Sequence, residues 1–332
     1  MNMKEWKKSV IQEPKKKAMP ILSFPSVQLM GISVKQLIAD SALQAEGMKR
    51  INERVDSLAS LSMMDLSVEA EAFGATVKAD DNEVPTIIGS IIKTIDDAKN
   101  LVIPNLYEAR TNLYIESIKK ATEIILDRPV FAGIIGPFSL AGRLMDMSEI
   151  MINCYIDPDM VKETLSKTTE FLIEYGKAFK KTGAHGIVMA EPAAGLLSPP
   201  LIEEFSSFYV KQIVEELKSD DFGVVYHNCG NTIPLIDSIL KINADAYHFG
   251  NAIDISEMLS IVPQETIIMG NIDPAGQFRN GTSETIYDET TKLLEKCSHH
   301  KNFVISSGCD IPPLASWENI DSFFKAVSDF YG

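Results

Sequence analysis

Seven short apolar runs alternate with longer helical patterns from residue 58 to the end of the chain. Of all the features of the sequence, this alternation restricts the possible folds most strongly. Strands that alternate with helices pair in parallel and are joined by right-handed crossovers. We therefore predict an α/β fold, a (β/α)8 TIM barrel, with residues 58–332 as its core. A doubly wound sheet is the alternative, but no GxGxxG motif follows a strand. The runs span residues 58–66, 129–135, 186–190, 222–226, 244–249, 266–269 and 303–306.

Helical and hairpin additions are predicted to join this barrel in one domain of 332 residues. The eighth strand is either short or supplied by the extended segment at residues 20–25. Residues 1–57 form an N-terminal extension and helix. In this part, the Lys-rich residues 1–17 are expected to be a solvated helix or arm, and Ser33 caps a helix that continues to about residue 54. Residues 75–82 resemble an inserted hairpin.

Metal-ligating residue types follow three of the apolar runs. His227 and Cys229 lie two apart after one run, and residues so spaced in an extended chain face the same way. Cys309 follows the last run, and Glu191 follows the run at residues 186–190. Since the carboxyl ends of barrel strands meet at one mouth, we predict a metal site there, with Glu191 as an optional fourth ligand or catalytic group. The alternative is that the thiols are small buried hydrophobes and the imidazole is merely hydrogen-bonded.

Further polar residues at the strand ends are candidates for substrate binding. Ser139 begins a helix whose free N–H groups could hold an anion, although an ordinary N-cap is the alternative. Arg143 could pair with a substrate anion or with a carboxylate such as Asp146. The candidates are Asp65, Ser139, Arg143, Asn271 and Asp273.

Charge and cysteine content limit the partners and the compartment. The formal net charge is −15, which argues against nucleic acid or an anionic membrane surface as a partner. The chain shows no signal peptide and no apolar run of transmembrane length. The four cysteines are therefore expected to be reduced, in a cytoplasmic protein. Cys154 and Cys297 lie within helical patterns and are expected to be structural.

Six motifs together resemble the uroporphyrinogen decarboxylase superfamily, and within it the corrinoid-dependent methyltransferases. The resemblance covers the chain from about residue 30 to its end. The motifs are Asp65-Leu-Ser-Val-Glu-Ala-Glu-Ala-Phe-Gly-Ala, Gly136-Pro-Phe-Ser-Leu-Ala-Gly-Arg, Glu191-Pro-Ala, His227-Asn-Cys-Gly-Asn-Thr, Gly270-Asn-Ile-Asp-Pro and Ser307-Gly-Cys-Asp-Ile-Pro-Pro.

The resemblance implies a zinc-dependent methyltransferase. Zinc would bind His227, Cys229 and Cys309, and would activate a small thiol substrate, for which coenzyme M fits the resemblance best. The co-substrate would be a methylcorrinoid, carried on a separate corrinoid protein as partner. Only a thiolate is a good nucleophile, and zinc coordination deprotonates a thiol.

Three alternatives to this function stay open. Another acceptor, such as a pterin of the tetrahydrofolate type, could replace the thiol. Uroporphyrinogen decarboxylation is a second, but the decarboxylases carry an Arg-Gln-Ala-Gly-Arg segment where this chain has residues 20–28, without arginine. The third is a non-catalytic barrel that binds a corrinoid protein and holds zinc only as a structural ion.

Overall fold

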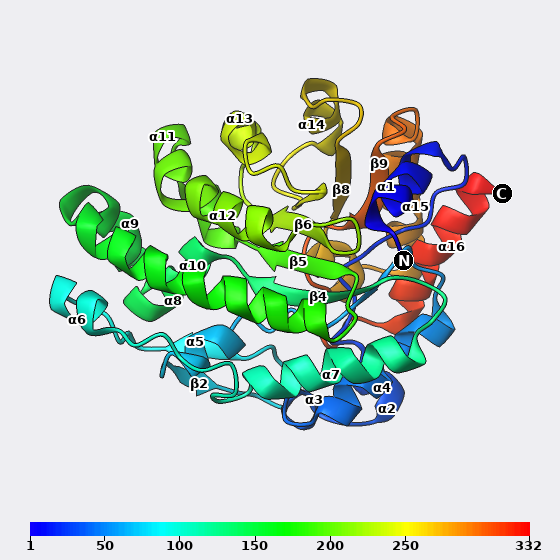
Figure 1. The fold of residues 1–332 in the computed structure, drawn as a ribbon. Coiled ribbons are helices and arrows are strands. Elements are labelled where there is room, and N and C mark those ends of the chain that lie inside the picture. Colours follow the sequence, from blue (N-terminus) through cyan, green and yellow to red (C-terminus); the bar gives the residue numbers. More distant parts are fainter.

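The computed structural model describes residues 1–332, and a parallel sheet of seven strands forms its centre (Figure 1). The sheet order is β1-β4-β5-β6-β7-β8-β9, so consecutive sheet strands are neighbours, as in the predicted barrel. The strands are β1 Ser60–Leu61, β4 Val130–Ile135, β5 Gly186–Ala190, β6 Gly223–Asn228, β7 Ala246–Phe249, β8 Ile267–Ile272 and β9 Phe303–Ser307.

An extended segment at residues 18–21 lies between the first and last strands. The N–H of Met19 donates to the carbonyl oxygen of Ile305 in β9 at 3.0 Å. The N–H of Leu58, just before β1, donates to the carbonyl oxygen of Ala18 at 2.8 Å. The segment thus bonds both edges of the sheet and takes the place of an eighth strand. An N-terminal extended segment was one of the two predicted alternatives, but the bonded residues are 18–21 rather than 20–25, and they do not form a regular strand.

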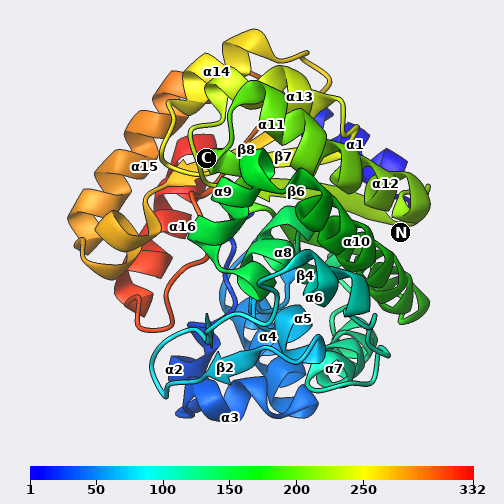
Figure 2. The ribbon, with the colours of Figure 1, turned by 90° about the vertical axis from the view of Figure 1, so that its left-hand side faces the viewer.

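Helices cover the outer face of the sheet (Figure 1 and Figure 2). The largest apolar core lies between this layer and the strands. The helices are α1 Met3–Gln12, α2 Ser26–Met30, α3 Val34–Ile38, α4 Ser41–Arg54, α5 Val68–Ala72, α6 Ile95–Asn100, α7 Thr111–Ile124, α8 Pro137–Met145, α9 Met147–Ile156, α10 Pro158–Lys181, α11 Pro199–Ile202, α12 Phe208–Leu217, α13 Ile236–Leu240, α14 Ile255–Ile261, α15 Ser283–Cys297 and α16 Trp317–Tyr331. None of them is long and apolar enough to span a bilayer.

A second, smaller apolar cluster fills the inside of the curved sheet. Every second residue of the strands contributes to it, including Val188 and Ala190 of β5, Val225 of β6 and Ala246 of β7. This alternation decides the direction of each polar side chain near the strand ends, because neighbours along a strand point to opposite faces. His227 follows Val225 by two and faces inward, whereas Glu191 follows Ala190 directly and faces the helices.

The prediction that residues 1–17 are solvated is wrong. Met3, Trp6 and Val10 of α1 are buried within the inner cluster, and the Trp6 ring lies 5.7 Å from that of Phe131. Lys7 forms an ion pair with Asp245, the residue before β7, at 2.9 Å. Helix α1 thus covers the amino-terminal end of the strands, opposite α9 and α11 in Figure 1.

The predicted additions are present, but the helix after Ser33 and the first strand are shorter than expected, and the hairpin extends beyond the predicted residues 75–82. The long helix from Ser33 is divided into α3 and α4, because Asp40 caps a new helix by accepting from the N–H groups of Ala42 and Leu43. The hairpin consists of β2 Thr76–Lys78 and β3 Thr86–Ile88, paired antiparallel. The run at residues 58–66 forms only the two-residue strand β1.

Candidate metal centre

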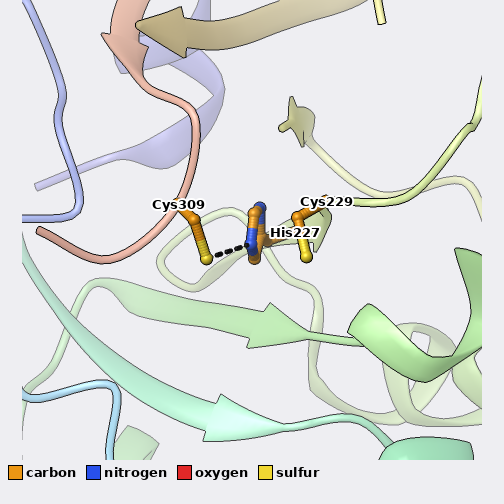
Figure 3. A group of neighbouring side chains, drawn as sticks. All are labelled: His227, Cys229 and Cys309. Carbon is orange, nitrogen blue, oxygen red and sulfur yellow. Dashed lines mark hydrogen bonds between the residues drawn. The ribbon is translucent and has the colours of Figure 1, made fainter. Parts of the chain in front are cut away.

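The ends of β6 and β9 bring one imidazole and two thiols together. The ligand atoms of His227, Cys229 and Cys309 all lie within 4.8 Å of one another, and the Sγ of Cys309 is 3.5 Å from Nε2 of His227 (Figure 3). His227 is buried, whereas Cys229 and Cys309 are half-buried residues. The other cysteines, Cys154 and Cys297, are buried in helices away from this group.

The thiols of Cys229 and Cys309 differ in acidity when no metal is bound. The thiol of Cys309 and, to a smaller extent, the imidazole of His227 lower the pKa of Cys229 to about 4 against the opposing effect of burial. The neighbouring Cys229 and burial raise the pKa of Cys309 well above its usual value. The pair therefore holds one thiolate at neutral pH, and a cation that replaces the remaining thiol proton would find two anionic sulfur ligands.

Two residues behind His227 were missed by the sequence analysis. Its Nδ1 lies 2.8 Å from Nδ1 of His248, whose Nε2 lies 2.7 Å from the hydroxyl oxygen of Ser306. His227 and His248 are paired across β6 and β7, and both face the inside of the sheet. Both imidazoles are at the ends of predicted neighbouring strands, so aligning those ends would have placed His248 beside the ligand.

The donor set fits zinc. Two thiolates and one imidazole are soft and borderline ligands that suit Zn²⁺, and three protein ligands leave one position for water or substrate, as in catalytic zinc sites. A structural site would be closed by a fourth protein ligand. The structure brings no fourth His, Cys, Asp or Glu into the group.

The structure separates Glu191 from this group and corrects its predicted role as ligand. Its Oε1 accepts from the N–H of Phe138 at 2.7 Å and its Oε2 from the N–H of Ser139 at 3.2 Å, so the carboxyl group binds the amino terminus of α8. The hydroxyl of Ser206 donates to Oε1 at 3.2 Å. The physical reason is the alternation along β5: Ala190 faces the inner cluster, so Glu191 faces α8.

Replacing Glu191 by glutamine should leave metal binding intact and weaken the fold. The amide would direct N–H donors at one or both backbone N–H groups of α8, and an unsatisfied buried donor costs about 1–3 kcal/mol. We expect an unchanged zinc content per chain by atomic emission, together with a lower free energy of unfolding by urea denaturation. Loss of zinc at unchanged stability would return Glu191 to the ligand set.

Asp65 is also committed to the fold rather than free for a substrate. Its side chain is fully buried, with Oδ2 accepting from Arg110 and from the hydroxyl of Tyr114, and Oδ1 accepting from the N–H and hydroxyl of Ser67. Arg110, which the sequence analysis missed, also pairs with Glu71 at 2.6 Å. The motif that contains Asp65 is thereby fastened to the start of α7.

Three further predicted residues have structural partners. The hydroxyl of Ser139 accepts from the N–H of Ala193 at 3.1 Å. The amide of Asn271 donates to the carbonyl oxygens of Gly250 and Ile253 at 3.0 and 2.9 Å, which holds the loop after β7. Asp273 accepts from the N–H groups of the two residues after Pro274. Asn271 and Asp273 do line an open cavity of about 380 Å³ beside the end of β8.

Arg143 is the predicted residue that stays available for an anion. It lies in α8, is half-buried, and has no partner among the ion pairs of the chain. Burial lowers the pKa of its guanidinium, while the charges of Asp65 and Glu69 raise it. Asp146, its predicted alternative partner, instead accepts from the N–H of Ser148 at the start of α9.

The buried carboxyl group of Glu69 makes the stability of the fold depend on pH. Burial raises the pKa of its carboxyl to about 7, and only Oε1 has a partner, the N–H of Ile135 at 3.1 Å. The folded chain therefore keeps a proton that the unfolded chain releases above about pH 4.5, so stability falls as the pH rises from about 4.5 to 7.

Glu69→Gln should remove this part of the pH dependence. Since glutamine never ionises, the variant should be more stable than the wild type at pH 8 by up to about 3 kcal/mol, and nearly equal to it at pH 4.5. Urea denaturation at both pH values measures the difference. If the variant lost as much stability between pH 4.5 and pH 8 as the wild type does, Glu69 would not be the source of this pH dependence.

The fold and this group define a class of protein: an α/β barrel with a His-Cys-Cys group at the carboxyl ends of its strands that could hold a metal ion. Within that class, the family model for uroporphyrinogen decarboxylase (URO-D) matches residues 16–330. The chain belongs to the uroporphyrinogen decarboxylase family.

Individual relatives divide between two activities. The chain is 29% identical over 270 residues to the methylcobamide:CoM methyltransferase MtbA of Methanosarcina acetivorans, covering 80% of this chain and 78% of the relative. It is 24% identical to the uroporphyrinogen decarboxylase of Hydrogenovibrio crunogenus, covering 83% and 80%. A solved methyltransferase from Methanosarcina mazei has the same fold, with a TM-score of 0.87, 22% identity and full coverage of both chains.

Proposed function

We propose that this chain is a zinc-dependent methyltransferase, which moves a methyl group from a methylated corrinoid to a thiol, with coenzyme M as the acceptor. The observation that carries the proposal is the His227-Cys229-Cys309 group in a chain similar to a methylcobamide:CoM methyltransferase. When bound, zinc would keep the acceptor thiol deprotonated and therefore nucleophilic at neutral pH.

The chain's own residues would hold and orient the reactants. His227, Cys229 and Cys309 would be the ligands for the ion, and the acceptor would take the position that three protein ligands leave open. Buried Glu191 and Asp65 keep α8 and the Asp65 motif in place around the mouth. We propose that the corrinoid is delivered by a separate corrinoid protein, which would dock over this mouth.

Arg143 is the proposed binding group for the sulfonate of coenzyme M. It has no ion-pair partner, whereas Arg110 is held by Asp65 and Glu71. A hydrogen bond to a charged group contributes about 1.5–3 kcal/mol, which corresponds to about 10–100-fold in affinity. Binding through Arg143 would select an anionic thiol over a neutral one.

Consumption of methylcobalamin, followed by absorbance, tests the acceptor. We expect turnover with coenzyme M, and about 10–100-fold lower kcat/KM with 2-mercaptoethanol, which has no sulfonate. Arg143→Gln should lower kcat/KM for coenzyme M to a similar extent and leave 2-mercaptoethanol unaffected. Equal loss with both thiols would mean that Arg143 does not bind the sulfonate.

The same assay separates the other functions. Turnover with tetrahydrofolate but with no thiol would replace the proposed acceptor. Zinc binding without turnover of any acceptor would favour a non-catalytic barrel. We expect no coproporphyrinogen from uroporphyrinogen, since residues 20–28 contain no arginine and residues 18–21 of the same segment bond the sheet edges.

A further inference from the structure

A chain of hydrogen bonds connects the candidate metal ligand His227 with the segment that lies between the first and last strands. Nδ1 of His227 is 2.8 Å from Nδ1 of His248, and Nε2 of His248 is 2.7 Å from Oγ of Ser306. The hydroxyl of Ser306 donates to the carbonyl oxygen of Met19 at 2.7 Å. All three side chains are buried, so no solvent competes for these bonds.

The direction of the chain is determined at its far end. A carbonyl oxygen only accepts, so the single hydroxyl proton of Ser306 points to Met19. Oγ of Ser306 must then accept from Nε2–H of His248. A neutral imidazole carries one N–H, so Nδ1 of His248 presents a lone pair and accepts from its neighbour. His227 therefore donates from Nδ1, and in its neutral ring Nε2 is bare.

A second, longer contact of the same nitrogen favours the same tautomer. Nδ1 of His227 also lies 3.3 Å from the backbone carbonyl oxygen of His248, which can only accept. No carboxylate is among the hydrogen-bond partners of either ring. At 2.8 Å the two Nδ1 atoms have room for one proton between them, so they form one donor and acceptor pair. These contacts place the shared proton on Nδ1 of His227 and leave Nδ1 of His248 as the acceptor.

We propose that His248 and Ser306 are positioning residues that hold His227 in its Nδ1–H tautomer, with the bare Nε2 directed at the thiols. Nε2 lies 3.5 Å from Sγ of Cys309, on the side where the three ligand atoms meet (Figure 3). The value of this tautomer for metal binding rests on the proposed function, because only an unprotonated ring nitrogen can be a ligand. The N-terminal segment thereby sets the chemistry of a ligand on β6.

The tautomers can be observed in the metal-free protein by two-bond ¹H–¹⁵N correlation spectra of the histidine rings. We expect a protonated Nδ1 and a bare Nε2 in His227, and the reverse in His248. Ser306→Ala should release this preference and give a mixture of tautomers in both rings. A wild-type His227 with the proton on Nε2 would overturn the proposal, whatever the protein binds.

Zinc affinity, measured by competition with a chelating dye, tests the consequence. Loss of a partner that orients a metal-ligating imidazole costs about 10–100-fold in affinity. We expect a loss of that size in His248→Leu and Ser306→Ala. His248→Asn should stay close to the wild type, because its amide oxygen can accept near the position of Nδ1.

Ser307→Ala is the matched control. Its hydroxyl is equally buried and accepts from the N–H of Ile21 in the same segment at 3.0 Å, but it makes no hydrogen bond to either ring. This variant should keep wild-type zinc affinity at a comparable loss of stability. Equal affinities in Ser306→Ala and Ser307→Ala would refute the positioning role, whereas a wild type that binds no zinc would refute the proposed function and leave the tautomer result standing.

Discussion

Cys309→Ser should lose zinc and lower methyl transfer to coenzyme M by more than about 100-fold. Loss of an outer partner of a ligand already costs about 10–100-fold in metal affinity, and loss of a ligand itself costs more. Serine is a poor substitute, because its hydroxyl stays protonated at neutral pH, whereas zinc sites use thiolate. Cys229→Ser should behave in the same way, since its thiol belongs to the same group of three. Atomic emission and methylcobalamin turnover measure the two losses.

Cys154→Ala provides the control for the loss of a thiol. Cys154 is buried in α9, and burial raises the pKa of its thiol to about 11, so it is not a thiolate at neutral pH. The variant should lose some stability and keep about one zinc per chain. If Cys229→Ser and Cys309→Ser both kept full zinc, the metal site would be wrong. If they lost zinc but kept turnover, zinc would not activate the acceptor.

The sequence predicted the strands better than it predicted the first residues. Long apolar runs separated by amphipathic helices are strong signals, and all seven runs contain strands of the sheet. The burial of α1 was missed because its apolar face is only Met3, Trp6 and Val10, among several lysines. This face is buried against the open end of the curved sheet. That end forms only when strands far apart in the chain have paired.

The candidate metal group was predictable because it needs only the spacing within one strand and the common mouth of a parallel barrel. His227 and Cys229 share a face through their spacing, and Cys309 ends another strand at the same mouth. Glu191 was misplaced for a definite reason. Strands of a parallel sheet are buried on both faces, so the apolar run of β5 shows no alternation that would tell which residues point inward.

The remaining residues that the sequence did not reveal are brought together by the register between strands. His248 becomes the partner of His227 because these two residues are paired across β6 and β7. Ser306 and Met19 join them from β9 and from the N-terminal segment. Such contacts depend on residues far apart in the chain, and no pattern within one strand indicates them.

Arg110→Met should destabilise the fold by about 3–5 kcal/mol, because it leaves the carboxylate of Asp65 buried without its charge partner. The side chain of Asp65 is fully buried and that of Arg110 is 13% exposed, so solvent cannot replace the guanidinium. The double variant Asp65→Asn/Arg110→Met should recover part of the loss, because it also removes the unpaired charge. Free energies of unfolding by urea denaturation at pH 7 measure both effects.

An exposed arginine is the control for the effect of burial on the stability of an ion pair. Arg50 pairs with Glu46 one turn away in α4 at 2.7 Å, and its side chain is 49% exposed. Exposed pairs of this kind contribute about 0.3–0.5 kcal/mol, so Arg50→Met should change stability by no more than that. If Arg110→Met were equally harmless, Asp65 would tolerate the loss of its partner and could itself serve a cationic substrate group. A large loss of stability that Asp65→Asn partly reverses would show that the ion pair stabilises the fold. Arg143 would then remain the proposed anion-binding residue.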